Sequence, residues 1–198
     1  MIKIIDKQIS EIYLQEITLD DISSTYVDWL NDSSINQFLE TRFQKQDITS
    51  ITQFVTNIIN SDKEFLFTIR LKKTGHHIGN IKIGPIYFHH GIGDVSLFIG
   101  DKNFWGLGFA NKAIKLISQY AFEQLKLRKL MAYSYKSNIA SIKAFLKAGY
   151  LQEGVRKLHY IDNNGIPNDL IELCYFNSQY DKSYLNDLFI EKTSDKDN

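Results

Sequence analysis

The stretch from Asp94 to Ala110 constrains the fold more than any other part of this 198-residue chain. Its first residues, Asp94-Val-Ser-Leu-Phe-Ile99, are typical of a β-strand, and its last ones begin a long amphipathic helix. Gly106 and Gly108 lie between the two elements, where they allow positive φ and bring successive N–H groups toward one point. The helix beginning near Phe109 directs its positive dipole end at the same point. The segment therefore predicts an anion site, first of all for a cofactor that carries a diphosphate.

Two well-known phosphate-binding patterns do not fit this turn. The dinucleotide fingerprint needs a third glycine where Asn111 stands and an acidic residue about twenty positions later, but the next strand ends near Tyr135 and Lys136. A P-loop needs Gly-Lys followed by Ser or Thr, and the chain has no such sequence. A third way of binding diphosphate remains, beside the simpler interpretation that the two glycines only connect a strand to a helix.

The charge balance and the cysteine content narrow the classes of partner. The chain has 23 lysine and arginine residues and 23 aspartate and glutamate residues. Because its net charge is zero, it has no overall electrostatic field that would attract nucleic acid or an anionic membrane, which favours a small-molecule or protein partner. Cys174 is the only cysteine, so an internal disulfide and a cysteine-based zinc cluster are excluded. The pairs His76-His77 and His89-His90 point to opposite faces of a strand and have no clear acidic partner, so we expect no metal. With no signal-peptide pattern at residues 1–10, we predict a cytoplasmic protein.

Hydrophobic periodicity divides the chain into β-rich and helical segments. Their order, β-α-α-β-β-β-α-β-α-β-β, predicts an α+β sandwich with a mostly antiparallel first part, and not a doubly wound sheet. We expect one domain over residues 1–192 and a polar tail over 193–198. The expected strands are 11–17, 65–71, 78–84, 95–99, 130–135, 150–156 and 170–176, and the expected helices are 18–30, 49–60, 109–127, 138–149 and 180–190.

With that order in hand, Trp105-Gly-Leu-Gly-Phe-Ala110 resembles the acetyl-CoA loop of the GCN5-related N-acetyltransferases (GNAT), with tryptophan in place of the usual glutamine or arginine, as in the RimJ/RimL-like branch. Asn138-Ile-Ala-Ser-Ile-Lys-Ala-Phe-Leu-Lys-Ala-Gly-Tyr150 and Glu153-Gly-Val-Arg156 resemble later segments of the same family, and the likeness runs from about residue 11 to 176. It implies the GNAT fold: a mixed, mostly antiparallel sheet flanked by helices, with a V-shaped splay between strands 95–99 and 130–135.

The resemblance also implies where acetyl-CoA binds. The pantetheine arm would pair with the strand 95–99, at a bulge that splays it from the strand 130–135. The pyrophosphate would lie on the N–H groups of the glycine turn, and Lys136 or Lys143 would meet the adenosine 3′-phosphate. The implied cofactor-binding residues are Leu97, Phe98, Ile99, Trp105, Gly106, Leu107, Gly108, Phe109, Ala110, Asn138, Ser141 and Lys143.

Such a cleft supports direct attack of a neutral amine on the thioester, without a metal. Asp94 stands where relatives commonly carry the base that accepts the amine proton, although it also suits a cap on the turn after Gly93. A backbone N–H near Phe98 or Ile99 would hold the oxyanion. Many relatives carry a tyrosine that protonates the leaving thiolate, but this chain has Phe145 there. Tyr150 or Ser141 would have to replace it, unless the thiolate leaves unaided, which a thiol pKa near 8.5 allows.

The acceptor is expected to lie between the first helices and the loop 85–93. The candidate substrate-binding residues are Trp29, Asn31, Glu40, Arg42 and His89, each of which also suits a solvated or structural position. Likeness to members that act in surface-glycan synthesis implies a nucleotide-linked amino sugar, with peptide α-amines as the second choice. Polyamines fit less well, since these segments carry mixed charge. A non-catalytic acyl-CoA-binding protein stays open, and the expected helix 180–190 either closes the core or forms the interface of a homodimer.

Overall fold

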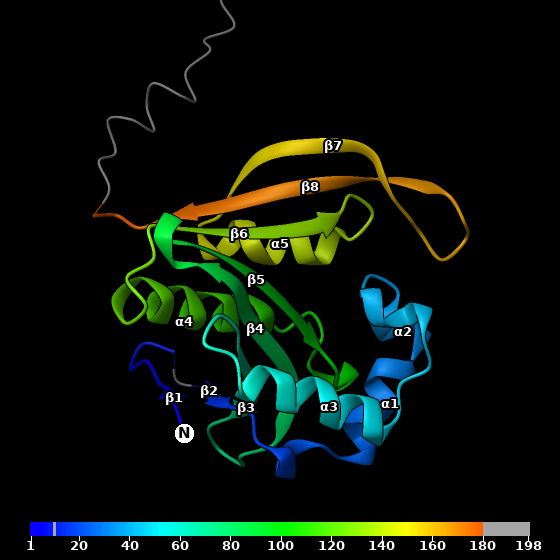
Figure 1. Cartoon of the computed structure of the whole chain (residues 1–198), viewed down its shortest axis with the longest axis horizontal. Coiled ribbons are helices and arrows are strands. Elements are labelled where there is room, and N and C mark those ends of the chain that lie inside the picture. Colours follow the sequence, from blue (N-terminus) through cyan, green and yellow to red (C-terminus); the bar gives the residue numbers. More distant parts are fainter. Residues whose placement is uncertain (10, 180–198) are drawn as a thin grey trace, which may run out of the picture.

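The computed structural model describes residues 1–9 and 11–179, and within them the chain forms one eight-stranded sheet (Figure 1). The strand order is β1-β2-β3-β4-β5-β6-β8-β7, and every neighbouring pair is antiparallel except β5 and β6. The strands are β1 (Lys3–Ile4), β2 (Ile12–Glu16), β3 (Phe65–Leu71), β4 (His77–Tyr87), β5 (Ile92–Ile99), β6 (Lys129–Tyr135), β7 (Leu151–Ile161) and β8 (Pro167–Phe176).

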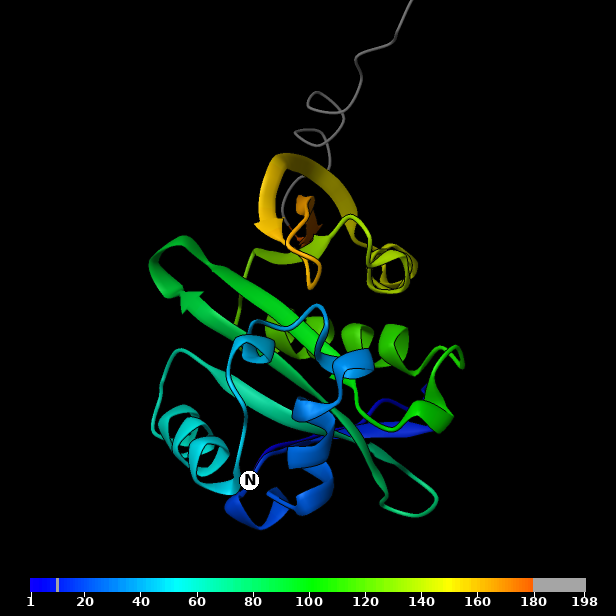
Figure 2. The same cartoon turned by 90° about the vertical axis from the view of Figure 1, so that its right-hand side faces the viewer.

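Helices cover both faces of this sheet, as the two views in Figures 1 and 2 show. α4 and α5 pack on one face around a core of aliphatic side chains, and α1 and α3 pack on the other around a second, smaller core. The helices are α1 (Ser24–Asn31), α2 (Ser33–Asn36), α3 (Ile48–Ile59), α4 (Phe109–Glu123) and α5 (Ile139–Ala148), with 3-10 turns η1 (Leu19–Asp21), η2 (Glu40–Phe43), η3 (Phe88–His90) and η4 (Lys102–Phe104).

The predicted α+β class and the predicted order of the main elements are confirmed, while the short elements β1 and α2 were not predicted and several boundaries differ. The predicted first helix, 18–30, divides into η1 and α1, because Ser23 caps a new helix with its side-chain oxygen. Asp32 in the same way caps α2, which was not predicted. The strand expected to end at residue 156 continues as β7 to Ile161, where it still pairs with β8. The expected helix 180–190, the domain limit at 192 and the tail 193–198 lie outside the described residues.

The predicted V-shaped splay lies between β5 and β6. These parallel strands pair only from Ile92 to Asp94 on β5, although β5 stays paired with β4 as far as Ile99. The strand edge of β5 that faces β6 is therefore unpaired beyond Asp94. The bulge was expected within β5, which is wrong: the extra residue lies on β4 at Gly84-Pro85, opposite Asp94, where proline has no N–H for the ladder.

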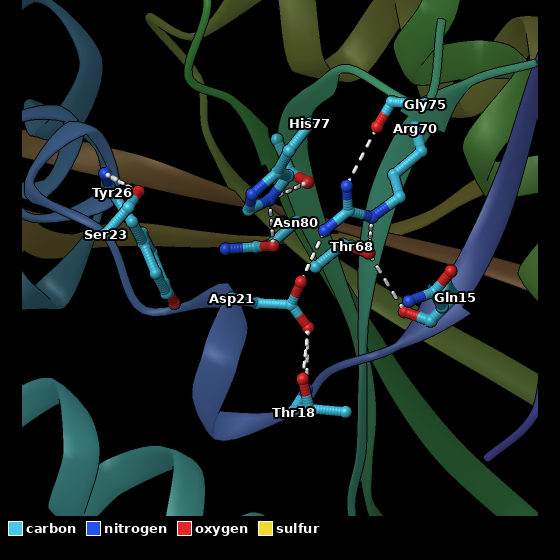
Figure 3. Close-up of polar contacts among 11 residues, drawn as sticks. Gln15, Thr18, Asp21, Ser23, Tyr26, Thr68, Arg70, Gly75, His77 and Asn80 are labelled. Atoms are coloured by element: carbon cyan, nitrogen blue, oxygen red, sulfur yellow. Dashed lines mark hydrogen bonds and ion pairs between the residues drawn. The ribbon is translucent and has the colours of Figure 1, made fainter.

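A buried polar network ties η1 to the sheet beneath α1 (Figure 3). Asp21 forms an ion pair with Arg70, whose Nε donates to Thr68 Oγ1 at 3.0 Å. On the next strand, His77 Nε2 lies 2.8 Å from the Asn80 side-chain oxygen. Burial lowers the pKa of His77, so its ring is held neutral. The network fixes the N-terminal helices against β3 and β4.

Within the described residues, no helix is long and apolar enough to cross a bilayer.

Candidate active site

A cleft of about 690 Å³ opens where β5 and β6 separate. One wall is the strand β5 from Asp94 to Ile99 and the turn that follows it, and the other is the end of β6 with α5. Residues of α2, of the segment that follows it and of the start of η2 also line the cleft. The lining also includes residues of β4, β7 and β8, so the cleft collects residues from widely separated parts of the chain.

The turn between β5 and α4 presents backbone to the cleft. Gly106 (φ 74°) and Gly108 (φ 81°) both adopt left-handed conformations, and a Cβ on either would meet no atom within 4 Å. Glycine is thus required by the backbone angle and not by space. Gly108 is the N-cap of the 15-residue helix α4, whose first N–H groups have no partner within the helix. Trp105 Nε1 donates to Ile99 O at 2.8 Å and braces the turn against the end of β5.

This arrangement fits the diphosphate and pantetheine of acetyl-CoA. The helix N-terminus and the preceding left-handed residues form a cradle for an anion. The unpaired edge of β5 offers backbone groups to an extended arm. In addition, Asn111 lines the cleft with a buried side-chain oxygen that has no hydrogen-bond partner among the described residues, as expected beside a polar ligand.

Nearly all the predicted cofactor-binding residues line this cleft. The exception is Leu107, whose side chain is 58% exposed and outside the lining, although its predicted role used the backbone N–H. Asn138 caps α5 by accepting from Ser141 N at 3.2 Å, which fixes its side chain at the cleft wall. Lys136 is absent from the lining and pairs with Asp169 at 3.2 Å, so of the two lysines predicted to meet the 3′-phosphate only Lys143 lines the cleft. The lining residues are Leu97, Phe98, Ile99, Trp105, Gly106, Gly108, Phe109, Ala110, Asn138, Ser141 and Lys143.

Asp94 lies at the apex of the V, as the last residue of β5 that pairs with β6. It lines the cleft together with Lys82 and Tyr133. Burial raises the pKa of Asp94, and the charge of Lys82 opposes that shift. The negative charge of Asp94 in turn helps burial to raise the pKa of Tyr133. A carboxylate with a raised pKa at the closed end of a cleft is suited to accept a proton.

A carboxylate and three aromatic side chains line the mouth of the cleft, and only the carboxylate was predicted from the sequence. Glu40 lines it, as predicted, beside Phe38, Tyr135 and Tyr160. These three rings were missed because they come from a loop and from the ends of two strands. Only Tyr135 stood at the end of an expected strand, 130–135, whereas Phe38 lies in a loop and Tyr160 beyond the expected strand 150–156. Arg42 does not line the cleft: its side chain is only 4% exposed and bonds to Tyr135 and to backbone carbonyls.

Two of the predicted site residues have structural positions instead. Tyr150 is 1% exposed, and its hydroxyl lies 3.2 Å from Ser118 Oγ beneath α4, away from the cleft lining. It therefore has no access to a leaving thiolate. Trp29 is buried in the smaller core, where its ring lies so close to Gly100 that a Cβ there would approach it to 2.1 Å. Trp29 supports the end of β5 from behind.

The remaining two predicted acceptor residues also lie outside the cleft lining. Asn31 binds the backbone of Gln46 through both side-chain atoms, at 2.8 and 2.9 Å, and so closes the loop that leads to α3. His89 lies in η3, where the chain turns from β4 into β5, and is exposed. Among the described residues, no group of three histidine, cysteine, aspartate or glutamate side chains could hold a metal ion.

Sequence comparison with known proteins finds similarity to acetyltransferases. The model of the acetyltransferase (GNAT) domain matches residues 11–151. An uncharacterized N-acetyltransferase, YoaA, of Bacillus subtilis (strain 168) is 26% identical over 157 residues, which are 79% of this chain and 88% of that protein. The spermidine N(1)-acetyltransferase of Escherichia coli (strain K12) is 30% identical over 106 residues, 54% of this chain and 56% of that protein.

Solved structures share the fold at lower identity. The spermidine N-acetyltransferase of Vibrio cholerae, in complex with CoA and spermine, superposes with a TM-score of 0.77 at 19% identity, covering 86% of this chain and 98% of that one. An acetyltransferase (GNAT family) from Bacillus anthracis gives a TM-score of 0.74 at 17% identity, covering 88% and 98%.

Proposed function

Because the chain belongs to the GNAT family of N-acetyltransferases, we propose that it transfers the acetyl group of acetyl-CoA to a primary amine of a small molecule. The observation that carries the proposal is the convergence of three features in one cleft. These are the N-terminus of α4 after the glycine turn, the unpaired edge of β5, and Asp94 at the apex. Trp105 before the turn supports the RimJ/RimL-like branch.

The cofactor residues divide between backbone and side chain. Backbone N–H groups of the turn from Gly106 to Ala110 hold the pyrophosphate, and the edge of β5 at Leu97, Phe98 and Ile99 holds the pantetheine arm. Asn138 and Ser141 contact the same arm from α5, and Lys143 pairs with the adenosine 3′-phosphate. Bound acetyl-CoA supplies an activated acetyl group as a thioester.

The reaction then needs a base, an oxyanion partner and an outlet for the thiolate. Asp94 accepts the proton of the amine as its nitrogen attacks the thioester carbon and the carbon–sulfur bond breaks. A backbone N–H at Phe98 or Ile99 stabilises the oxyanion. Phe145 cannot donate a proton and Tyr150 lies in the core, which leaves two routes: Ser141, which lines the cleft, donates to the thiolate, or the thiolate leaves unaided and takes a proton from water.

The proposed class of acceptor depends on which residues line the mouth of the cleft and on the acceptors of named relatives. The expected nucleotide-linked amino sugar was implied by a family likeness, and two of the candidate substrate-binding residues that could contact its phosphate groups, Arg42 and His89, do not line the cleft. Two of the relatives act, by name, on spermidine. We therefore place small aliphatic amines first, nucleotide-linked amino sugars second and peptide α-amines third. A cytoplasmic location and a homodimer stay predictions.

Thiol release from acetyl-CoA tests this order with three acceptor panels: aliphatic amines, nucleotide-linked 3-amino or 4-amino sugars, and peptides with free α-amines. A reaction without acceptor is the blank. Turnover confined to the first panel supports the assignment. Turnover confined to another panel replaces the acceptor, and turnover with none supports the alternative of a non-catalytic acyl-CoA-binding protein.

Asp94→Asn tests the chemistry. Loss of the base is expected to lower kcat/KM by about 10²–10⁴-fold while calorimetric affinity for acetyl-CoA stays the same. Asp20→Asn, which removes an exposed carboxylate outside the cleft, is the matched control and is expected to keep the wild-type rate. A variant that loses acetyl-CoA affinity together with rate would show that Asp94 supports the cleft and is not its base.

A further inference from the structure

Arg42 forms a buried clamp at the mouth of the cleft. Its Nη1 donates to Leu39 O at 3.0 Å, and its Nη2 donates both to the Tyr135 hydroxyl and to Ile161 O, each at 2.8 Å. The guanidinium carbon lies 4.2 Å from the centre of the Phe43 ring and 5.2 Å from that of Tyr135. One side chain thus ties η2 to the ends of β6 and β7. Because it is 4% exposed, it cannot serve as a docking point for an anionic substrate.

The clamp sets the direction of a hydrogen bond. The Tyr135 hydroxyl accepts from Arg42 Nη2, so its single proton is left for Glu40, whose Oε1 accepts it at 3.0 Å. Burial raises the pKa of Tyr135, which keeps that proton in place at neutral pH. Glu40 Oε2 has no hydrogen-bond partner among the described residues, and the side chain is 62% exposed. One carboxylate oxygen is anchored and the other is open.

Aromatic rings surround this carboxylate. The Tyr135 ring centre lies 5.6 Å from that of Phe38 and 5.2 Å from that of Tyr160, and all three rings line the cleft with Glu40. Tyr160 follows an irregularity of β7 between residues 156 and 160, which resets the direction of its side chain. An open carboxylate oxygen beside aromatic faces is a favourable place for an ammonium group.

Two positive charges beside the cleft, Lys82 and Arg42, are already engaged. Lys82, which lines the cleft at its apex, forms an ion pair with Glu64 at 2.5 Å. Arg42 shares its charge with two backbone carbonyls and lies 3.5 Å from Glu40 Oε1, on the anchored side of the carboxylate. Asp94 and Glu40 are thus two acidic groups along one cleft, the first placed for the reacting amine and the second for another charge.

We propose that Glu40, Phe38, Tyr135 and Tyr160 form a subsite for a second ammonium group of the acceptor, and that Arg42 is the positioning residue that holds this subsite in shape. This inference rests on the proposed function and deepens it, because it makes the acceptor a diamine or polyamine. The reacting nitrogen lies toward Asp94 while the distal ammonium binds Glu40.

Matched acceptors test the subsite: α,ω-diamines of increasing length against n-alkylamines of the same length. In the wild type, diamines are expected to have a lower KM than the matching alkylamines, with an optimum length that reports the spacing between the two acidic groups. Glu40→Gln is expected to raise KM for diamines about tenfold, leave kcat nearly unchanged and leave the alkylamines unaffected. Glu123→Gln, an exposed carboxylate of α4 outside the cleft lining, is the control.

Two further variants separate the carboxylate from its supports. Tyr135→Phe removes the proton donated to Glu40 and is expected to raise the diamine KM about threefold. Arg42→Lys keeps the charge but loses the forked contacts, and is expected to act like Tyr135→Phe on diamines. Unchanged KM for acetyl-CoA and unchanged melting temperature are required for either result to count, so Tyr135→Phe decides if Arg42→Lys fails to fold.

The outcomes for the subsite and for the enzyme are distinct. If Glu40→Gln weakens alkylamines as much as diamines, or changes neither, the subsite is overturned while the transferase activity stands. If no amine is acetylated, the proposed function fails. Calorimetric titration of a diamine and its matching alkylamine into the CoA-bound protein then decides the subsite alone. Preferential diamine binding that Glu40→Gln removes would support it, and equal binding would overturn it.

Discussion

The two halves of the cleft are built in different ways. The half assigned to acetyl-CoA is mainly backbone: the turn from Gly106 to Gly108, the first turn of α4 and the free edge of β5. The half assigned to the acceptor is made of side chains, and the Arg42 clamp joins positions 93 and 119 residues apart in the chain. A backbone site depends on a short stretch of sequence, whereas a side-chain site depends on the whole fold.

This difference explains why the two halves can serve different needs. A diphosphate is recognised by N–H groups that any residue supplies, provided that the backbone angles are right. An acceptor is recognised by carboxylate, hydroxyl and aromatic groups, whose identity can change without altering the sheet. The donor half can thus stay constant while the acceptor half varies.

The largest expected effect is on affinity for acetyl-CoA, and it comes from a substitution in the donor half of the cleft. Gly108→Ala places a Cβ at φ 81°, and a left-handed conformation destabilises a non-glycine residue by roughly 1–2 kcal/mol. Since the strain falls on the turn that holds the pyrophosphate, affinity for acetyl-CoA is expected to fall about tenfold, as measured by calorimetry. Gly165→Ala, at φ 77° in the β7–β8 turn and equally open, is the control for strain alone. Equal affinity in both variants would break the assignment of the turn.

A smaller effect is expected at the apex, where the two halves meet. The charge of Lys82 opposes the burial that raises the Asp94 pKa, so Lys82→Met is expected to raise that pKa further. The base must be ionised to act, and therefore the acid limb of kcat/KM should move to higher pH, by up to about one unit. Glu64→Gln, which keeps the lysine charge, should not move the limb upward. An unmoved limb in Lys82→Met would mean that Asp94 does not set it.

The smallest expected effect lies behind the acceptor half, in the network of Figure 3. Burial lowers the His77 pKa below 6.5, so the unfolded chain takes up a proton before the folded chain does. The contribution of neutral His77 to the free energy of unfolding is therefore fully present above about pH 6.5. It is lost as pH drops through the folded pKa, by at most about 1.4 kcal/mol per pH unit. Urea unfolding at pH 7.5, 6.5 and 5.5 should show this slope, and His77→Gln should flatten it. The exposed His90→Gln is expected to keep the wild-type slope.

What the sequence could predict follows the same division. Local patterns were sufficient for the strands, for α4 and for the glycine turn, because each depends on neighbours in the chain. Asp94 was assigned from the family resemblance, at the strand position where relatives commonly carry an acid, and its role as the base stays a prediction. Trp29 and Tyr150 were assigned to the site but belong to the core, since whether an aromatic residue lines a cleft or fills a core depends on what packs against it.

The acceptor half shows the limit most clearly. Glu40 and Arg42 were predicted as one pair of ligand-binding charges, but only Glu40 lines the cleft. Arg42 is turned inward by carbonyl groups and a tyrosine from β6 and β7, which no local pattern associates with η2. Tyr160 was missed for a related reason, because its direction depends on an irregularity in the pairing of β7 with β8.

The reach of Arg42 also has a consequence for the order in which the protein is completed during synthesis. The glycine turn, α4 and α5 have all been made by residue 148, whereas the carbonyl that completes the clamp belongs to Ile161, and β8, which lies between β6 and β7, ends at Phe176. A nascent chain therefore has every element of its donor site before its acceptor wall can close. Among the described elements, the β7–β8 hairpin is the last to be synthesised, and it determines when the proposed acceptor side of the cleft can form.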